Sequence, residues 1–254
     1  MRDSADFRLD DKQLYELKIA ALLHDCGKIT TPEAVIDKST KLETIYDRIE
    51  TVDTRFEILK RDAEIAMLKR QLECDSEKDK LTATQEYEET VRQLDEELNF
   101  LHFSNTGGEF MSAEDQQRIH QISQHRWLHN GEEVPLLSDN EVYNLNIERG
   151  TLTPEEREII NNHIVATIKM LKTLPFPKNL RNIPEFAGGH HEKMDGTGYP
   201  GGLTGDQMSL QARIMAIADV FEALTAKDRP YKAGKKLSES LHILGLMKLD
   251  NHID

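Results

Sequence analysis

Two stretches of the sequence repeat apolar side chains at alternating intervals of four and three residues, which is the spacing of a coiled coil. A helix with such a stripe must bury it against another helix. Because the charged segment 73–80 separates the stripes, we expect two long helices that fold back as an antiparallel hairpin. One continuous helix that pairs with another chain, and solvated helices that act as a spacer, are the alternatives. The stripes consist of Ile45, Ile49, Val52, Phe56 and Leu59, and of Tyr87, Val91, Leu94, Leu98 and Leu101.

The negative charge of the chain is concentrated in the segment that contains these stripes. Residues 42–149 hold 25 Asp and Glu against 12 Lys and Arg, whereas the rest of the chain holds 21 against 20. The acidic segment is unsuited to a DNA or RNA polymer, but the near-neutral remainder can receive an anionic ligand. We therefore expect a core made of residues 1–41 and 150–254, interrupted by an acidic helical insertion over 42–149. The insertion is also the expected surface for a homodimer or a protein partner.

Outside the insertion, apolar residues recur at helical spacing, and no segment shows a convincing strand pattern. The sequence therefore predicts an all-α fold. Loops and short helices are expected over 104–150, which leads back to the core. The expected core helices run from Asp10 or Asp11 to about Asp25, from Thr153 to just before Pro175, through a third segment leading to His190, over about 210–226, and onward from near Leu237.

The composition excludes some classes of protein. No apolar run approaches the roughly 18 residues that a membrane helix needs. The first ten residues are too polar for a secretory signal. Two cysteines, Cys26 and Cys74, do not build a disulfide framework, so we expect a reducing, cytoplasmic environment.

Asp219 lies in a stretch that is apolar on nearly every side of a helix. Its neighbours over 214–221 are almost all apolar, so its carboxyl group should be buried. The pair His24 and Asp25 poses the same problem, because it follows the apolar segment 19–23. An isolated buried carboxylate is costly and must be paired, protonated or bound to a metal.

Three histidines elsewhere offer imidazoles for the same centre. His163 lies on an amphipathic helix, and by itself it would be interpreted as a surface or hydrogen-bonded histidine. His190 and His191 are adjacent, and neighbouring helical positions point about 100° apart, so the two rings can serve two metals. A metal site therefore explains the acids and imidazoles together. We interpret the remaining histidines of a polar stretch in the insertion as ordinary surface residues: His120, His125 and His129.

Four short segments of the core carry the residue pattern of one known family. They read LHDCGKI at 23–29, HHE followed by DGTGYP within 190–200, ADVFEALT at 218–225 and DRPYK at 228–232. The first segment resembles the signature of the HD superfamily of metal-dependent phosphohydrolases. The other three resemble the defining segments of its HD-GYP subfamily. The resemblance covers the expected core and leaves the insertion unmatched.

The resemblance implies a bundle of helices around a centre of two or three divalent metal ions, with iron or manganese favoured over zinc. Asp25 takes the position of the bridging carboxylate. Lys28 would lie beside the phosphate as a charge partner or proton donor, and Arg229 and Lys232 would bind the other phosphate or a guanine edge. Tyr199 would offer an aromatic face to a base, or would pin its own loop. The implied metal ligands are His24, Asp25, His163, His190, His191 and Asp219.

The implied activity is hydrolysis of cyclic di-GMP, a bacterial second messenger, to linear pGpG and then GMP, with 3′,3′-cGAMP as another candidate substrate. Paired metal ions can orient a phosphate and stabilise the attacking and leaving oxygens. Two other interpretations stay open. One is a generic HD nucleotide phosphohydrolase, against which the GYP segment argues. The other is a degenerate domain that binds a cyclic dinucleotide or a protein partner.

The sequence departs from the family pattern at both ends. The family places another histidine ligand on a helix upstream of the HD pair, whereas His24 is the first histidine of this chain. The family also continues for another helical stretch beyond the position of Asp254. We therefore expect a truncated domain in which one metal position is occupied less completely and the activity is lower.

Overall fold

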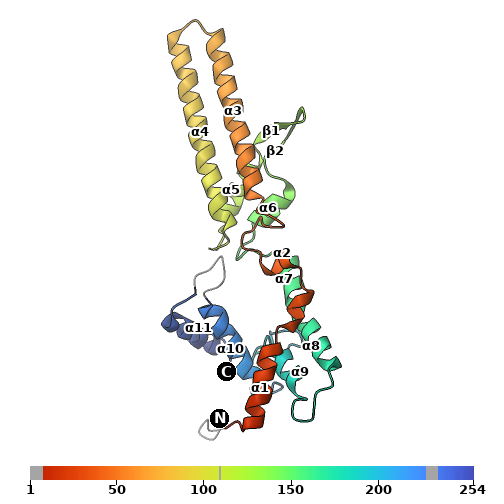
Figure 1. Cartoon of the computed structure of the whole chain (residues 1–254). Coiled ribbons are helices and arrows are strands. Elements are labelled where there is room, and N and C mark those ends of the chain that lie inside the picture. Colours follow the sequence, from red (N-terminus) through yellow and green to blue (C-terminus); the bar gives the residue numbers. More distant parts are fainter. Residues whose placement is uncertain (1–7, 109, 227–233) are drawn as a thin grey trace. The chain divides into compact units, whose positions relative to one another are not determined.

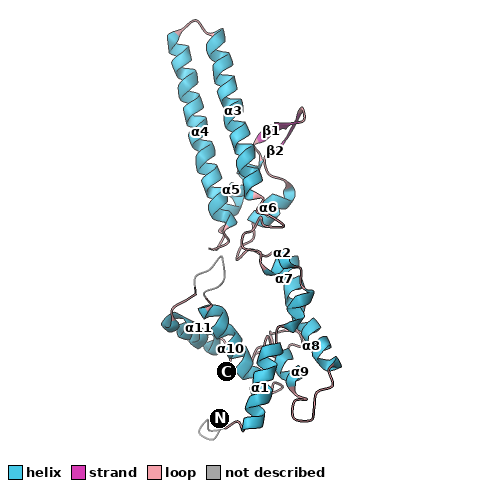
Figure 2. Cartoon of the chain, in the orientation of Figure 1, coloured by secondary structure: helices cyan, strands magenta, loops and turns pink. Residues whose placement is uncertain are grey.

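The computed structural model of the chain describes residues 8–108, 110–226 and 234–254. Helices make up most of these residues, together with one two-stranded sheet (Figure 2). The predicted all-α class is therefore confirmed. None of the helices in the described ranges has both the length and the apolar composition to span a membrane. The chain divides into two compact units, one made of residues 1–36 and 156–254 and the other of residues 37–155.

The first unit is a bundle of short and medium helices (Figure 1). Its first helix, α1, begins after Asp10, whose carboxylate accepts a hydrogen bond from the backbone N–H of Gln13 at 2.8 Å in a capping box. Helix α7 (Pro154–Asn161) directly precedes α8 and leads into the second part of the unit. The other elements are α1 (Asp11–Leu23), the 3₁₀ helix η2 (Cys26–Thr30), α2 (Glu33–Ile36), α8 (His163–Thr173), α9 (Ile183–Gly188), α10 (Leu210–Thr225) and α11 (Leu237–Leu249).

Helix α9 lies at the centre of this unit and packs against α1, α8 and α10. Apolar side chains from all four helices are buried together, including Ala20, Leu171, Phe186 and Met215. The buried carboxylate of Glu16 on α1 accepts a hydrogen bond from the backbone N–H of Asn182, just before α9, at 2.8 Å. A carboxylate at a helix N-terminus is favoured by the helix dipole. His24 lies eight residues after Glu16, and His190 lies eight residues after Asn182. The rings of these two histidines are 4.8 Å apart, so α1 and α9 place them side by side.

The helix expected from Thr153 to Pro175 is divided at Asn162 into α7 and α8. At this break the Nδ1 atom of His163 lies 2.5 Å from the carbonyl oxygen of Ile160. A side chain that bonds to a nearby carbonyl competes with the regular backbone ladder. The expected single helix was therefore wrong at one position, and that position carries a predicted metal ligand.

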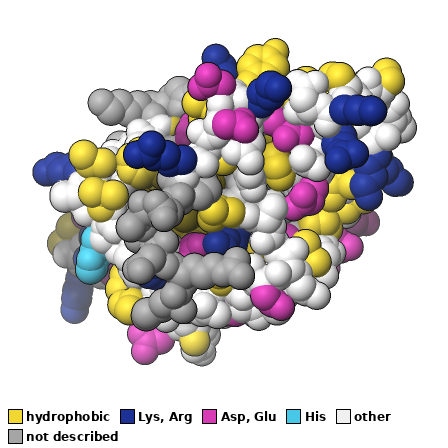
Figure 3. Space-filling model, turned by 90° about the horizontal axis from the view of Figure 1, so that it is seen from below, with side chains coloured by type: hydrophobic (Ala, Val, Ile, Leu, Met, Phe, Trp, Pro, Cys, Tyr) yellow, Lys and Arg dark blue, Asp and Glu magenta, His cyan; other side chains and the backbone are white. Residues whose placement is uncertain are grey.

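Charged side chains of both signs are interspersed with apolar ones on the face shown in Figure 3. The first unit also holds partly exposed ion pairs, such as Arg213 with Asp254 at 2.9 Å and Lys235 with Glu239. Exposed ion pairs contribute roughly 0–1 kcal/mol each. The stability of the unit therefore depends mainly on the apolar core around α9.

The second unit contains the predicted helical hairpin, formed by α3 (Ile49–Glu73) and α4 (Glu77–Asn105), which pack side by side (Figure 1). Phe56 of the first stripe and Leu94 and Leu101 of the second are buried in its core. Ile45 was assigned wrongly to the first stripe, since it precedes α3 and is 98% exposed. The turn spans residues 74–76 and is shorter than the charged segment 73–80, because Glu77 already belongs to α4.

The segment after the hairpin contains α5 (Ala113–Ser123), strands β1 (Arg126–His129) and β2 (Glu132–Pro135), and α6 (Asp139–Leu145). The antiparallel pair β1–β2 contradicts the expectation that the chain holds no strand. Its loop consists of Asn130 and Gly131, both with positive φ of 53° and 84°. An Asn-Gly pair is the preferred loop of a two-residue hairpin, so this signal was present in the sequence.

A buried lysine holds the second unit together near the end of α6. The side chain of Lys41 is 1% exposed, and its Nζ atom donates to the carbonyl oxygens of Leu145 and Ile147 at 2.9 and 2.8 Å. Burial lowers the pKa of Lys41 to about 8. A neutral amine has two N–H donors, which match these two carbonyls, so the deprotonated lysine still satisfies both.

We predict that the free energy of unfolding of the wild-type protein rises relative to Lys41→Met as the pH rises from about 8 to 10.5. The unfolded lysine keeps its proton up to its ordinary pKa of 10.5, whereas the folded lysine releases it at about 8. The unfolded state therefore binds more protons in this window, and stability increases with pH. At pH 7 the free energy of unfolding of Lys41→Met should already be about 1–3 kcal/mol lower than that of the wild type, because two buried carbonyls lose their donor. Urea denaturation of both proteins across this range measures the difference, and a difference that stays constant with pH would contradict this role.

Candidate metal centre

The structure brings all six predicted metal ligands together in the first unit. They form two groups, and within each group the candidate ligand atoms all lie within 4.8 Å of one another. His24 and Asp25 follow the end of α1, His163 begins α8, His190 and His191 follow α9, and Asp219 lies within α10. One group consists of Asp25, His163, His190 and His191, and the other of His24, Asp25 and Asp219.

Asp25 belongs to both groups, and its two carboxylate oxygens face different partners. Its Oδ1 atom lies 3.1 Å from Nε2 of His163 and 3.9 Å from Nε2 of His190. Its Oδ2 atom lies 3.2 Å from Nε2 of His24 and 2.5 Å from Nζ of Lys28. The Nε2 atom of His24 is also 3.5 Å from Oδ1 of Asp219. Asp25 is thus the member that the two groups share.

Three of the histidines share one backbone contact that fixes how their rings point. The Nδ1 atoms of His24, His163 and His190 lie 2.7, 2.5 and 2.6 Å from the carbonyl oxygen three residues earlier. A carbonyl only accepts, so each Nδ1 carries a hydrogen and donates it, while Nε2 is directed into the centre. Ligating histidines commonly hold their second ring nitrogen in this way.

Two buried atoms of the centre lack hydrogen-bond partners within the described part of the chain. They are Oδ1 of Asp25 and Nε2 of His190. Both are acceptors when the acid is ionised and Nδ1 carries the ring hydrogen, so they would repel each other unless a proton or cation lay between them. The donor set of carboxylate oxygens and imidazole nitrogens suits divalent first-row metals. The residues therefore fit a metal centre.

The electrostatics of the metal-free site follow from burial and from the two acids. Hydrogen bonding to Asp219 and then to Asp25 raises the pKa of His24 to about 10. Burial, together with the neighbouring rings of His190 and His163, lowers the pKa of His191 to about 3. Burial opposes ionisation of Asp25, but contacts with His163, His24 and Lys28 outweigh it and hold its pKa below the ordinary value. The centre therefore presents ionised carboxylates and a neutral His191.

A close approach of η2 to α8 sets the distance between Asp25 and His163. The backbone N–H of Gly27 donates to Oγ1 of Thr167 at 2.9 Å, and Thr167 is fully buried. A Cβ atom on Gly27 would lie 2.0 Å from the carbonyl oxygen of His163, so only glycine fits there. Neither the packing role of Gly27 nor the hydroxyl of Thr167 was found from the sequence. A threonine four residues after His163 lies on the same helix face, which was the available signal.

The loop after His191 is anchored by Glu192. Its buried carboxylate accepts hydrogen bonds from the backbone N–H groups of Gly201 at 2.6 Å and Leu203 at 2.8 Å. The ring of Tyr199, within this loop, stacks on His191 with 4.8 Å between ring centroids and 22° between planes. Glu192 was recognised only as part of a motif, and its anchoring role was missed. One face of Tyr199 is occupied by His191, which matches the loop-pinning interpretation.

The other predicted site residues lie in different surroundings. Lys28 contacts Asp25 and its side chain is 45% exposed. Arg229 and Lys232 lie outside the described residues. Neither His120, His125 nor His129 belongs to a ligand group of the described chain. Nε2 of His125 instead lies 2.7 Å from a carboxylate oxygen of Glu97.

Comparison with known proteins gives the class of this site. Residues 138–254 match the family model described as HD domain. The chain is 42% identical over 96 residues to 3′3′-cGAMP-specific phosphodiesterase 3 of Vibrio cholerae serotype O1, covering 37% of this chain and 20% of that protein. It is 40% identical over 116 residues to a probable cyclic di-GMP phosphodiesterase of the same organism, covering 44% and 26%. It is 39% identical over 94 residues to a cyclic di-GMP phosphodiesterase of Thermotoga maritima, covering 37% and 25%.

Residues 138–254 therefore match an HD domain, and the relatives named as cyclic di-GMP and 3′3′-cGAMP phosphodiesterases support the resemblance to the HD-GYP type. The matched part spans only about a fifth to a quarter of the length of these relatives.

We predict that Thr167→Val lowers the affinity for Mn²⁺ by about tenfold or more, the usual range for a residue that supports metal ligands. The substitution leaves the N–H of Gly27 buried without an acceptor, which costs roughly 1–3 kcal/mol of stability and lets η2 move away from α8. Thr167→Ser keeps the hydroxyl and should retain the affinity. Titration with Mn²⁺ measures both variants. Unchanged affinity in Thr167→Val, or equal losses in the two variants, would contradict a specific role of the hydrogen bond.

Proposed function

We propose that this chain is the catalytic part of a metal-dependent phosphodiesterase that hydrolyses cyclic di-GMP to pGpG and then GMP. The observation that carries this proposal is the convergence of five other candidate ligand side chains around Asp25, with buried acceptor atoms facing one another. The names of the relatives support a cyclic dinucleotide as substrate and include 3′3′-cGAMP as a second candidate. This is the enzyme class that the motifs predicted.

In this proposal His24, Asp25, His163, His190, His191 and Asp219 hold two or three divalent ions, with iron or manganese favoured. Asp25 would be the ligand common to two ions, because its oxygens face the two ligand groups separately. When bound, such ions supply Lewis acidity toward phosphate oxygens and lower the pKa of water. The backbone carbonyls that accept from the Nδ1 atoms keep the imidazoles oriented toward the centre.

The chain's own residues would orient the substrate and move protons. Lys28 is anchored on Asp25 at 2.5 Å yet remains accessible, so its ammonium can contact a phosphate oxygen or protonate the leaving ribose 3′-oxygen. Burial raises the pKa of Tyr199 to about 12, so its hydroxyl keeps its hydrogen and can donate to substrate. The anchor at Glu192 holds the loop of Tyr199 in place.

The hairpin is proposed to mediate homodimer formation. Ile65 and Leu68 on α3 are each 47% exposed and Leu72 is 87% exposed, at intervals of three and four residues. These positions differ from the stripe that packs on α4, so α3 presents a second apolar stripe of coiled-coil spacing. A second copy of the chain can cover it with its own identical stripe.

We predict that Asp25→Ala abolishes turnover of cyclic di-GMP and lowers the metal content, while circular dichroism shows unchanged helix content. Removal of this carboxylate takes a ligand from both groups. Asp11→Ala, an exposed acid on α1, is the matched control and should retain activity. Chelator-treated protein should be inactive and regain activity with Mn²⁺ or Fe²⁺. Retained turnover by Asp25→Ala would refute the assignment, and a metal-loaded wild type that binds but never cleaves either dinucleotide would favour a binding module.

We also predict that Ile65→Glu with Leu68→Glu converts a dimer of the chain into a monomer, since two buried glutamates would oppose association. Leu237→Glu with Leu241→Glu, at exposed positions of α11, is the control and should leave the dimer intact. Light scattering measures the mass of each protein. A monomeric wild type, or a dimeric Ile65/Leu68 variant, would contradict this role of α3.

A further inference from the structure

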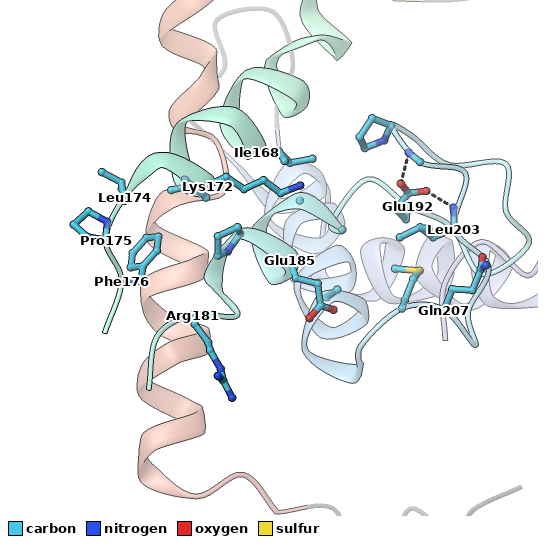
Figure 4. Close-up of a pocket in the computed structure, with 18 residues that line it drawn as sticks. Ile168, Lys172, Leu174, Pro175, Phe176, Arg181, Glu185, Glu192, Leu203 and Gln207 are labelled. Carbon is cyan, nitrogen blue, oxygen red and sulfur yellow. Dashed lines mark hydrogen bonds between the residues drawn. The ribbon is translucent and has the colours of Figure 1, made fainter. Parts of the chain in front are cut away.

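A cavity of about 710 Å³ lies beside the candidate metal centre, between α8, α9, the start of α10 and the loop after His191 (Figure 4). Its volume is in the range of sites that bind small molecules. Most of its wall is apolar and includes Ile168, Leu174, Phe176, Leu203 and Met208. The six candidate metal ligands are not among its lining residues in the described chain. It is therefore a separate site.

A few charged and polar groups stand around this apolar space. Lys172 on α8, Arg181 before α9 and Glu185 on α9 all line the cavity and are exposed at its margin (Figure 4). Glu192 also lines it, but both of its oxygens are engaged by Gly201 and Leu203. The charged groups available to a ligand are thus two cations and one carboxylate, and Gln207 adds an amide.

These groups match the chemistry of one ligand class. Apolar walls with a phenyl ring accept the flat face of a nucleobase. A carboxylate accepts from the adjacent N1–H and N2 amine of guanine, whereas adenine has an acceptor at N1 beside its N6 amine. Lysine and arginine bind phosphate through charge-assisted hydrogen bonds. A purely apolar ligand would leave Glu185 unused, and a simple anion would leave the apolar walls unused.

We propose that this cavity binds a guanine mononucleotide, the end-product class of the proposed reaction, at a site apart from the metal centre. The choice of guanine rests on the proposed function, whereas the cavity and its charges do not. Phe176 and the prolines nearby receive the base, Glu185 accepts from its N–H groups, and Lys172 and Arg181 bind the phosphate.

The cavity shares one wall with the metal centre. Pro200, Gly201 and Leu203 line it, and they belong to the loop whose Tyr199 stacks on His191. Gly188 and Gly189 also line it and directly precede His190. A nucleotide in the cavity therefore touches the two segments that position the adjacent histidines. Product bound there would act on the centre through this loop.

The test is titration of the chelator-treated full chain with GMP and AMP by calorimetry. Without metal there is no turnover, so the binding result is independent of the proposed activity. We expect one saturable GMP site that binds AMP at least about tenfold more weakly, since each lost hydrogen bond to a charged group is worth a factor of this order. Lys172→Glu should weaken GMP binding at least about tenfold, and Glu185→Gln should remove most of the preference for GMP.

The matched control is Lys169→Glu, an equally exposed lysine on α8 that does not line the cavity. It carries the same charge change and should leave GMP binding unchanged. Absence of GMP binding, equal binding of GMP and AMP, or equal losses in the Lys169 and Lys172 variants would each overturn the proposal. GMP binding together with an inactive metal-loaded protein would leave the cavity site standing and refute the phosphodiesterase assignment alone.

Discussion

The arrangement of the first unit depends on the half-buried carboxylate of Asp25, whose two oxygens face separate groups of candidate ligands. Four helical elements, α1, η2, α8 and α9, begin or end near this point, and α10 passes it, so that the six side chains meet. The parallel course of α1 and α9, fixed by the contact of Glu16 with the start of α9, brings His24 and His190 to the same level. The hydrogen bond from Gly27 to Thr167 then sets the approach of α8. An uncompensated charge in this partly buried site would oppose folding, so a cation bound there would add to the stabilisation that these contacts provide.

The same logic explains why the loop after His191 is held so closely. Glu192 carries a negative charge into the interior, and two backbone N–H groups satisfy it. The loop in turn places Tyr199 against His191. This loop thus borders both the candidate metal centre and the neighbouring cavity. Any ligand in the cavity meets residues that are one or two positions from the candidate ligands.

Much of the site was predictable from the sequence because charged and titratable side chains, which are costly to bury, occur within or next to apolar helical segments. Asp219 and the pair His24 and Asp25 are of this kind, and His190 and His191 were recognised by their motif. Thr167 escaped prediction because a hydroxyl on an amphipathic helix carries no mark of its partner, which lies 140 residues away in the sequence. In the second unit the heptad stripes predicted α3 and α4, but the wrong assignment of Ile45 shows that spacing alone does not locate a helix start. The hairpin β1–β2 was missed although Asn130 and Gly131 are its typical loop. The buried Lys41 was missed because lysine is ordinarily a surface residue.

We propose that Asp25 is a ligand shared by two metal ions. Electron paramagnetic resonance of the Mn²⁺-loaded protein tests this role of Asp25 directly. Two Mn²⁺ ions bridged by one carboxylate are magnetically coupled, so the wild-type protein should give the spectrum of a coupled pair once metal is in excess. Asp25→Asn should give the spectrum of isolated Mn²⁺ ions at the same loading. If the wild type shows isolated ions at every loading, the two ligand groups do not act as one centre and the account of Asp25 is wrong.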